Sequence, residues 1–328
     1  MKNRVDYIDV AKGIGIILVI LGHTIEKGTI WNCIYGFHMP FFLFCSGIFY
    51  RKNRWKKQLV KILCSYFLLA CVGVMLWYLF VERGNIVYIK QSIYNIIVGG
   101  AAPKYGIYPV EALWYLVTFA TIILINAILS VIKNKKIIFV FSFFISAIGL
   151  MLGYKFRNRI DMLYNIDVSL ALYPFYLIGT EWDKIQNNKY YKRLFGKKYS
   201  ILFAFVIYCI VANLNGFVNV YKAVYGNYLC VIYISGLLGS ILLLEFSKKI
   251  CSNMDILKST RMPRTILVMF GKSTLIIMGT HQIVIRIIKL IWPGCVVALE
   301  FIITSVIMFL IVIIEQKLKE ASANASKI

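Results

Sequence analysis

The chain alternates between long apolar stretches and short segments that carry most of its charged residues. A helix needs about 17–25 mostly apolar residues to cross a bilayer. About ten stretches approach this length, and they cover residues 7–25, 34–50, 60–81, 109–131, 137–154, 168–181, 200–215, 224–246, 267–290 and 295–315. The pattern predicts an all-α integral membrane protein with about ten transmembrane helices. Residues 86–98 are predicted as a further helix at the membrane interface.

Composition agrees with this architecture. Hydrophobic residues make up 60% of the chain and charged residues only 16%, whereas soluble domains carry about 25% charged residues. The apolar stretches leave no segment long enough for a separate soluble domain. We therefore expect one transmembrane domain over residues 1–328, with a core at about 5–316 and a cytoplasmic tail at 317–328.

The net charge of +23 is distributed unevenly along the chain. If the ten spans alternate in direction, the Lys- and Arg-rich segments 51–61, 133–136, 184–198 and 248–272 share one side with both termini. Cytoplasmic loops of membrane proteins carry such an excess, which predicts cytoplasmic termini in the cell (inner) membrane. The bilayer thus accounts for the charge, and nucleic acid is not predicted as a partner.

The eight cysteines show no CxxC pair or clustered spacing, so no metal site is predicted.

The first apolar stretch carries two ionisable groups on one helical face. Lys12 and His23 are eleven residues apart, which in a helix is three turns plus about 20° of rotation and about 16 Å of rise. Asp9 lies one turn before Lys12. One interpretation is that Lys12 reaches the headgroups and His23 ends the helix at the interface. Ionisable groups inside a span more often face the bundle interior and mark function, and two on one face favour that interpretation.

The other two histidines extend this set. His38 opens the second apolar stretch, across a short predicted outer loop from His23, so the two imidazoles are expected to meet at the outer mouth of one helical hairpin. The alternative for His38 is an interfacial residue hydrogen-bonded to backbone. His281 lies deeper, in the ninth stretch, where a packing hydrogen bond is the alternative.

Two further groups of polar residues flank the apolar stretches. Glu111 and Trp114 lie one turn apart at the predicted outer end of the fourth. The carboxylate can orient a histidine or a sugar hydroxyl and the indole can stack on a sugar ring, although an aromatic belt beside an interfacial carboxylate is the alternative.

Arg51 begins the basic run RKNRWKKQ, on the predicted cytoplasmic side below Lys12. This run either anchors the chain or cradles an anionic ligand. GKS at 271–273 is not a phosphate-binding loop, because Ile266 stands where its first glycine is required.

Four segments together resemble the acyltransferase-3 family of integral membrane acyltransferases, most closely its fucose and polysaccharide O-acetyltransferases: YIDVAKGIGIILVILGHT, FHMPFFLFCSGIFYRK, EALWYL and FGKSTLIIMGTH. Lys12 and His23 fall on the family's motif of a basic residue followed by histidine, and Ser46 with Gly47 on its serine-glycine pair. The family often has arginine where this chain has Lys12. Lysine holds a phosphate as a point charge but lacks the two-pronged contact of arginine.

The resemblance implies a bacterial enzyme that moves an acetyl group from cytosolic acetyl-CoA to a hydroxyl of a cell-envelope polysaccharide or its lipid-linked precursor. Acetyl-CoA would be held by Lys12, Arg51, Ser46 and Lys272. His23 would act as general base or accept the acetyl group transiently, with His38 and Glu111 orienting it or the acceptor. Trp114, Tyr115, His281 and Asp9 would contact the acceptor. No metal is implied, and the oligomeric state is left open.

Two other functions fit a chain of this kind. Charged groups inside many spans also suit a transporter or flippase for a glycan precursor, although the inverted repeat common in transporters is not visible in the sequence. The chain could instead be a non-catalytic partner in polysaccharide assembly. In that case substitutions at His23 and Glu111 would be silent.

Overall fold

The computed structural model describes residues 2–100, 104–156, 162–197, 199–254 and 261–325. These residues are helical apart from short connections and a two-stranded antiparallel sheet, in which β1 (Val218–Asn219) pairs with β2 (Val224–Tyr225). The predicted all-α class is confirmed. Contacts divide the chain into two compact units, one formed by Met1–Glu26 with Phe246–Ile328 and the other by Lys27–Glu245. They are called unit 1 and unit 2, and each is described by itself.

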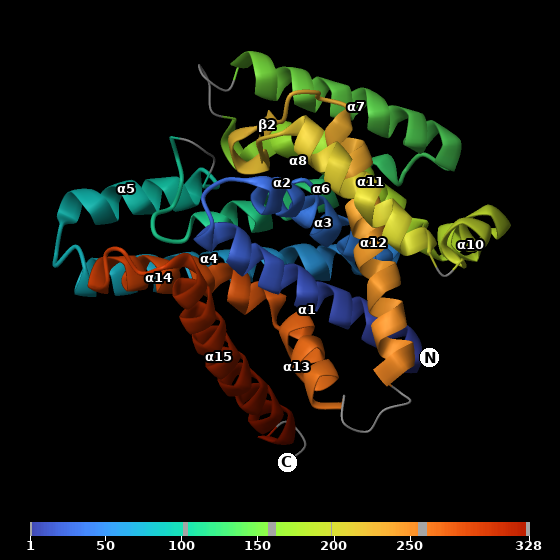
Figure 1. The fold of residues 1–328 in the computed structure, drawn as a ribbon. Helices are drawn as coiled ribbons and strands as arrows, with labels where there is room; N and C mark the ends of the chain where they lie inside the picture. Colours follow the sequence, from blue (N-terminus) through green and yellow to red (C-terminus); the bar gives the residue numbers. More distant parts are fainter. Residues whose placement is uncertain (1, 101–103, 157–161, 198, 255–260, 326–328) are drawn as a thin grey trace. The chain divides into compact units, whose positions relative to one another are not determined.

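Unit 1 is a bundle built around its N-terminal helix. Its helices are α1 (Lys2–Thr24), α13 (Arg261–Lys272), α14 (Thr274–Ile291) and α15 (Val297–Ala325), together with the end of α12 (Val231–Met254). α1 packs against α13, α14 and α15 (Figure 1). The apolar window of α1 is 67% buried, compared with 28% for α14 and 22% for α15, so α1 is the central helix of this unit.

Close contact between α1 and α13 depends on two glycines. A Cβ atom at Gly13 would lie 2.1 Å from the carbonyl oxygen of Leu267, and one at Gly271 would lie 1.9 Å from that of Asp9. Small residues let two backbones approach to this distance in a membrane bundle. An ion pair between Asp6 and Arg264, with 3.0 Å between Oδ2 and Nη2, also joins the two helices.

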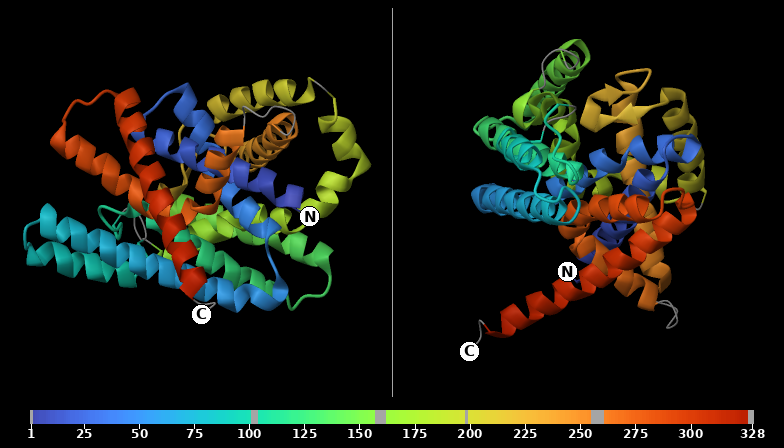
Figure 2. Two further views of the ribbon diagram at one scale, coloured as in Figure 1. Left: turned by 90° about the horizontal axis from the view of Figure 1, so that it is seen from below. Right: turned by 90° about the vertical axis from the view of Figure 1, so that its left-hand side faces the viewer.

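Unit 2 contains the remaining helices: α2 (Thr29–Tyr35), α3 (His38–Ile48), η1 (Lys52–Arg54), α4 (Trp55–Phe80), α5 (Ile86–Ile97), η2 (Glu111–Leu113), α6 (Trp114–Leu129), α7 (Lys135–Phe156), η3 (Leu163–Asn165), α8 (Ile166–Thr180), α9 (Trp182–Asn187), α10 (Lys189–Phe195), α11 (Ser200–Asn215) and η4 (Val220–Lys222). α8 is its core, since it packs against α3, α6 and α7 and its side chains at Tyr173, Phe175 and Tyr176 are fully buried. α4 and α5 run side by side (Figure 2). The helix predicted at 86–98 is present as α5.

Seven described helices are long and apolar enough to cross a membrane: those within Asp6–Thr24, Lys52–Phe80, Glu111–Leu129, Lys135–Lys155, Val231–Ser252, Thr274–Ile291 and Val297–Ser322. The bent pair α10 and α11, at 85° to each other, would make an eighth. The prediction of about ten is therefore only partly confirmed.

The stretches predicted at 34–50, 168–181 and 200–215 are helices too short to count alone. The first is broken at Gly36 and Phe37, between α2 and α3. The second becomes α8, a helix of only 15 residues, and the third becomes α11, with 16.

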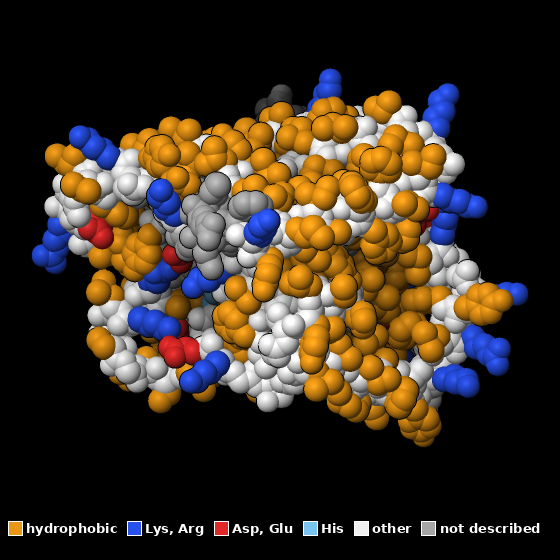
Figure 3. Space-filling view, turned by 90° about the horizontal axis from the view of Figure 1, so that it is seen from above, with side chains coloured by type: hydrophobic (Ala, Val, Ile, Leu, Met, Phe, Trp, Pro, Cys, Tyr) orange, Lys and Arg blue, Asp and Glu red, His pale blue; other side chains and the backbone are white. Residues whose placement is uncertain are grey.

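Many large apolar side chains point outward, as a lipid environment requires. On α7, Val140, Phe144 and Met151 are each about two-thirds exposed. Figure 3, viewed from the side on which α7 lies in Figure 1, shows apolar side chains over most of this face and Lys and Arg side chains gathered toward its left and right sides. The surface is that of a multi-pass membrane protein.

Candidate functional site

Unit 1 holds the charged end of the predicted site. Lys12 Nζ lies 2.7 Å from Asp9 Oδ1, and the two side chains are 20% and 7% exposed. The carboxylate of this ion pair is buried and the ammonium group partly buried, on the central helix of unit 1. Lys272 is exposed at the end of α13, directly after Gly271, which packs against the backbone of Asp9. The structure thus places Lys272 directly after the glycine that contacts the Asp9 backbone, while Lys12 pairs with Asp9 on α1.

Two histidines meet in the same unit. The ring centroids of His23 on α1 and His281 on α14 are 5.0 Å apart, with the ring planes at 47°. His281 is fully buried and its Nδ1 donates a hydrogen bond of 2.8 Å to the carbonyl of Ile277. Since a carbonyl can only accept, this contact places the hydrogen on Nδ1 and leaves a lone pair on Nε2 in the neutral ring. That buried Nε2 has no hydrogen-bond partner among the described residues.

His38 lies in unit 2, so its expected meeting with His23 stays a prediction. Its side chain is buried and its Nδ1 donates to the carbonyl of Ile34 over 2.9 Å, while Tyr35 packs edge-on against the ring at 4.7 Å. The backbone hydrogen bond is the arrangement that the alternative interpretation of His38 anticipated. Sequence reasoning placed His281 among acceptor contacts but did not foresee its contact with His23.

The remaining predicted residues around the fourth span belong to unit 2. Glu111 begins η2 and is partly exposed. Trp114 is buried and stacks on Tyr221, with centroids 5.6 Å apart. Tyr115 is buried against Phe119 at 6.2 Å. The indole face predicted to stack on a sugar is thus already covered on one side by Tyr221.

Ser46 and Arg51 flank the end of α3 in unit 2. Ser46 Oγ donates to the carbonyl of Phe42 over 2.8 Å, within its own helix. Arg51 is exposed directly before η1. Because Lys12 belongs to unit 1, a joint phosphate site of Lys12 and Arg51 stays a prediction.

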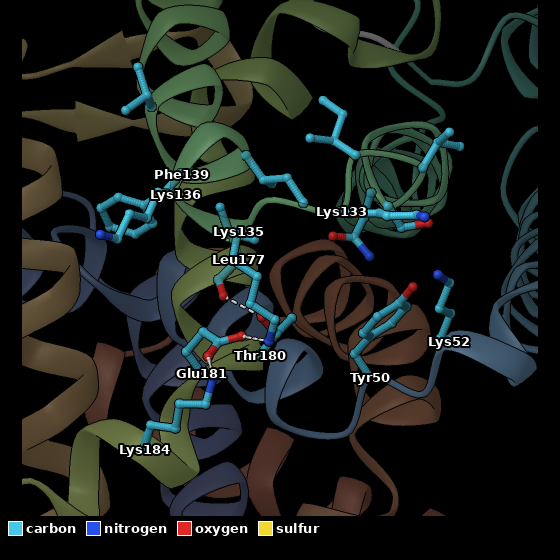
Figure 4. Close-up of a pocket in the computed structure, with 16 residues that line it drawn as sticks. Tyr50, Lys52, Lys133, Lys135, Lys136, Phe139, Leu177, Thr180, Glu181 and Lys184 are labelled. Carbon is cyan, nitrogen blue, oxygen red and sulfur yellow. Dashed lines mark hydrogen bonds and ion pairs between the residues drawn. The ribbon is translucent and has the colours of Figure 1, made fainter.

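The structure adds a feature that sequence reasoning missed, a large cavity of unit 2 rimmed by lysines (Figure 4). Its lysines come from the segments after α3, after α6 and after α8. These segments were counted for membrane orientation, but sequence alone gave no sign that they converge. Among the described residues, no group of three or more His, Cys, Asp or Glu is arranged to hold a metal ion.

Comparison with known families decides the class of chemistry. The family model described as an acyltransferase domain, that of the acyltransferase-3 family, matches residues 5–314. The chain belongs to the acyltransferase-3 family. The match covers most of each unit and both histidines of unit 1, and it confirms the resemblance to the family, while the branch of O-acetyltransferases stays a prediction. Neither the curated proteins nor the solved structures compared with the chain give a match.

Membership in the acyltransferase-3 family makes this protein a membrane acyltransferase. Acyl transfer to a hydroxyl requires a base that takes the hydroxyl proton, and imidazole is the side chain most often used. Within unit 1, the paired rings of His23 and His281 supply such a group in a buried setting. This pair is the candidate catalytic centre.

Proposed function

We propose that this membrane acyltransferase moves an acetyl group from cytosolic acetyl-CoA to a hydroxyl of a cell-surface polysaccharide or its lipid-linked precursor. The observation that supports the proposal most directly is the pairing of His23 with His281, whose Nε2 is buried without a partner among the described residues. In an acyltransferase, an imidazole lone pair at such a place is suited to proton transfer.

The reaction needs one proton acceptor and one proton donor. His23 takes the proton of the acceptor hydroxyl while the hydroxyl oxygen attacks the thioester carbonyl carbon. The carbon–sulfur bond then breaks, and the departing thiolate takes the proton from His23. His281 Nε2 accepts a hydrogen bond from His23 or from the acceptor, and the bond from His281 to the Ile277 carbonyl fixes the ring for this role. Atoms and charges balance without a further reactant.

The donor would be held at the other end of α1. Lys12 and Lys272 would contact its phosphates, and an arriving phosphate would compete with Asp9 for Lys12. The rise of about 16 Å between Lys12 and His23 along the helix suits a slender pantetheine arm that carries the thioester from one to the other. Arg51 and Ser46 are proposed as further donor contacts. His38, Glu111, Trp114 and Tyr115 are proposed on the acceptor side.

His23→Ala tests the assignment. Purified chain in vesicles, given radiolabelled acetyl-CoA and envelope glycan, is expected to label the glycan, and the variant to do so at least about 100-fold more slowly, because a general base contributes that much. Thr280→Val is the matched control, since the Thr280 hydroxyl donates to its own helix at Ile276.

The outcomes separate the candidate functions. A normal rate for His23→Ala, in a variant that inserts and elutes as wild type does, would refute the role of His23. A wild-type chain that translocates glycan precursor without incorporating acetyl would favour the transporter function instead. If neither acetyl transfer nor translocation occurs, the non-catalytic function is favoured.

A further inference from the structure

The cavity of unit 2 has a volume of about 960 Å³, which is in the range of sites for whole small ligands. Three segments far apart in the sequence supply its polar rim. Lys52 comes from η1, and Lys184 from α9. Lys133 lies in the connection between α6 and α7, and Lys135 and Lys136 begin α7. The sequence predicts all three segments on the cytoplasmic side.

The rim carries far more positive than negative charge. Among the residues that line the cavity, Glu181 is the only carboxylate. It pairs with Lys135 at 2.5 Å and with Lys184 at 2.6 Å. Figure 4 shows this trio on one side of the cavity, with Tyr50 and Lys52 on the other. Partial burial opposes ionisation of Glu181, but its hydrogen bonds and ion pairs with the two lysines prevail and lower its pKa.

The other three rim lysines have no such compensation. Lys52, Lys133 and Lys136 form no ion pair with the described part of the chain. Their mutual repulsion is reduced by solvent, yet nothing in the described structure balances it. A negatively charged ligand would do so.

The start of α7 strengthens the same preference. This helix of 22 residues begins at Lys135, so its positive dipole end is at the cavity, and its first turn has no acidic residue. Cations are unfavourable at a helix N-terminus and anions are favourable there. At this helix start, Asn134 Oδ1 accepts a hydrogen bond of 3.0 Å from the backbone N–H of Lys136. Charge repulsion and the helix dipole thus favour an anion at the same rim.

The lining of the cavity includes two buried hydrogen-bond donors that have no acceptor among the described residues. Asn126 is 5% exposed, and its Oδ1 accepts from Tyr173 Oη over 3.1 Å. Its Nδ2 is buried with no partner among the described residues, as is Tyr50 Oη. An amide N–H₂ and a phenol both donate to phosphate or carbonyl oxygens. Unpaired buried donors are costly, and an acceptor group on a ligand in the cavity would pair them.

We propose that this cavity is a binding site for a phosphate-bearing ligand, with the phosphate between the rim lysines and the rest of the ligand reaching Asn126 and Tyr50. The apolar walls suit a ligand with a long arm or tail: Val131, Ile132, Ile138, Phe139, Val140 and Leu177. Two molecules share this chemistry, the nucleotide end of an acyl-CoA and the headgroup of an anionic phospholipid. The nucleotide source rests on the proposed function, but it would place the donor phosphates at the rim lysines in place of Lys12 and Lys272. The phospholipid source does not rest on the proposed function, and it leaves Lys12 and Lys272 as the proposed donor contacts.

The test uses the full chain and two probes. Adenosine 3′,5′-bisphosphate stands for the nucleotide and is titrated into chain held in nanodiscs of phosphatidylcholine. Phosphatidylglycerol stands for the lipid, and its retention by detergent-purified chain is counted by native mass spectrometry. Lys133→Gln with Lys136→Gln removes two unpaired lysines. Lys189→Gln with Lys192→Gln is the matched control, because both are exposed on α10 and outside the cavity lining.

Removing the two rim lysines is expected to weaken binding of the responsible probe about 25-fold, at about fivefold for each lysine. The control pair is expected to leave it unchanged. Glu181→Gln is expected to tighten binding, because it removes the opposing charge and frees Lys135 and Lys184. Nucleotide loss alone identifies the nucleotide source, and lipid loss alone identifies the phospholipid. Unchanged binding of both probes in the rim variant, equal loss in the control, or weaker binding in Glu181→Gln would overturn the proposal.

Acetyl transfer is measured on the same preparations, so that the two proposals fail separately. Nucleotide binding needs neither acyl group nor acceptor, and it can succeed in a chain that transfers nothing. If the chain transfers acetyl and the rim variant binds nucleotide and lipid as the wild type does, the cavity site alone is refuted.

Discussion

At the scale of single residues, His281 matters because its two nitrogens have different surroundings. Nδ1 is held by the carbonyl of Ile277, whereas Nε2 is buried beside His23 without a partner among the described residues. A histidine that served packing alone would be expected to pair both nitrogens, because an unpaired buried polar atom is destabilising. The arrangement is consistent with the proposed positioning role of His281 toward His23 or the acceptor, which stays a proposal.

His281→Phe separates this role from packing. Phenylalanine keeps a ring at the buried position but removes both nitrogens, so the melting temperature in detergent is expected to change little. Acetyl transfer is expected to fall by at least about 10-fold, since the support for the base is lost. The rate and the melting temperature of the same sample check this. An unchanged rate would make His281 a structural residue.

The sequence predicted the part of this site that lies on one helix. Helical periodicity places Asp9, Lys12 and His23 from their spacing alone, and the Asp9–Lys12 pair is observed. The contact of His23 with His281 joins positions far apart in the chain, and no local pattern encodes it. The convergence of the rim lysines was missed for the same reason. The run that contains Lys52 was considered as a site for an anionic ligand, but charges in loops indicate a side of the membrane and not which loops meet.

At the scale of elements, glycine decides how closely helices pack in unit 2. A Cβ atom at Gly47 on α3 would lie 2.0 Å from the carbonyl oxygen of Tyr176 on α8, and one at Gly179 would lie 2.1 Å from that of Phe44. The two helices therefore touch backbone to backbone. α3 has 11 residues and α8 has 15, so these glycines place the backbones of two short helices in direct contact.

Gly47→Ala is expected to destabilise the chain by roughly 1–3 kcal/mol, because the methyl group forces the α3 and α8 backbones apart. Gly36→Ala is the matched control at the preceding helix end, where a Cβ would lie 3.1 Å from its nearest atom, the Asn32 carbonyl oxygen. Thermal unfolding in detergent checks both variants. Equal melting temperatures for the two would contradict the packing argument.

The number of spans was overpredicted in the region of α3 and α8 because both helices are short and apolar. Hydropathy detects apolar residues but not the helix ends within an apolar stretch, so residues 34–50 read as one span although Gly36 and Phe37 interrupt it and only α3 lies wholly inside it. α8 is apolar because protein surrounds it, and a buried core helix and a lipid-facing helix look alike by composition. The long helices α4 and α7 lie close to the spans predicted at 60–81 and 137–154, whereas α15 continues to Ala325, beyond the predicted end at 315.

At the scale of the whole molecule, the number of spans is tied to the position of the termini. An odd number of crossings, such as the seven long helices, places the termini on opposite sides. An even number, reached if α10 and α11 form one further crossing, places them on the same side. The Lys and Arg distribution predicts that both are cytoplasmic. Taken together, these observations favour an even count.

Reporters fused after Ile328 decide this point. Green fluorescent protein is expected to fluoresce there and alkaline phosphatase to stay inactive, because the basic segments hold the C-terminal tail in the cytoplasm. The two fusions control for each other, since each reporter works on only one side. Active phosphatase with dark fluorescent protein would mean an odd number of crossings. That result would also place the C-terminal tail, with Lys317 and Lys319, outside the cell, against the charge rule. The same rule predicts that the rim lysines of unit 2 face the cytosol, so this second prediction would lose its support.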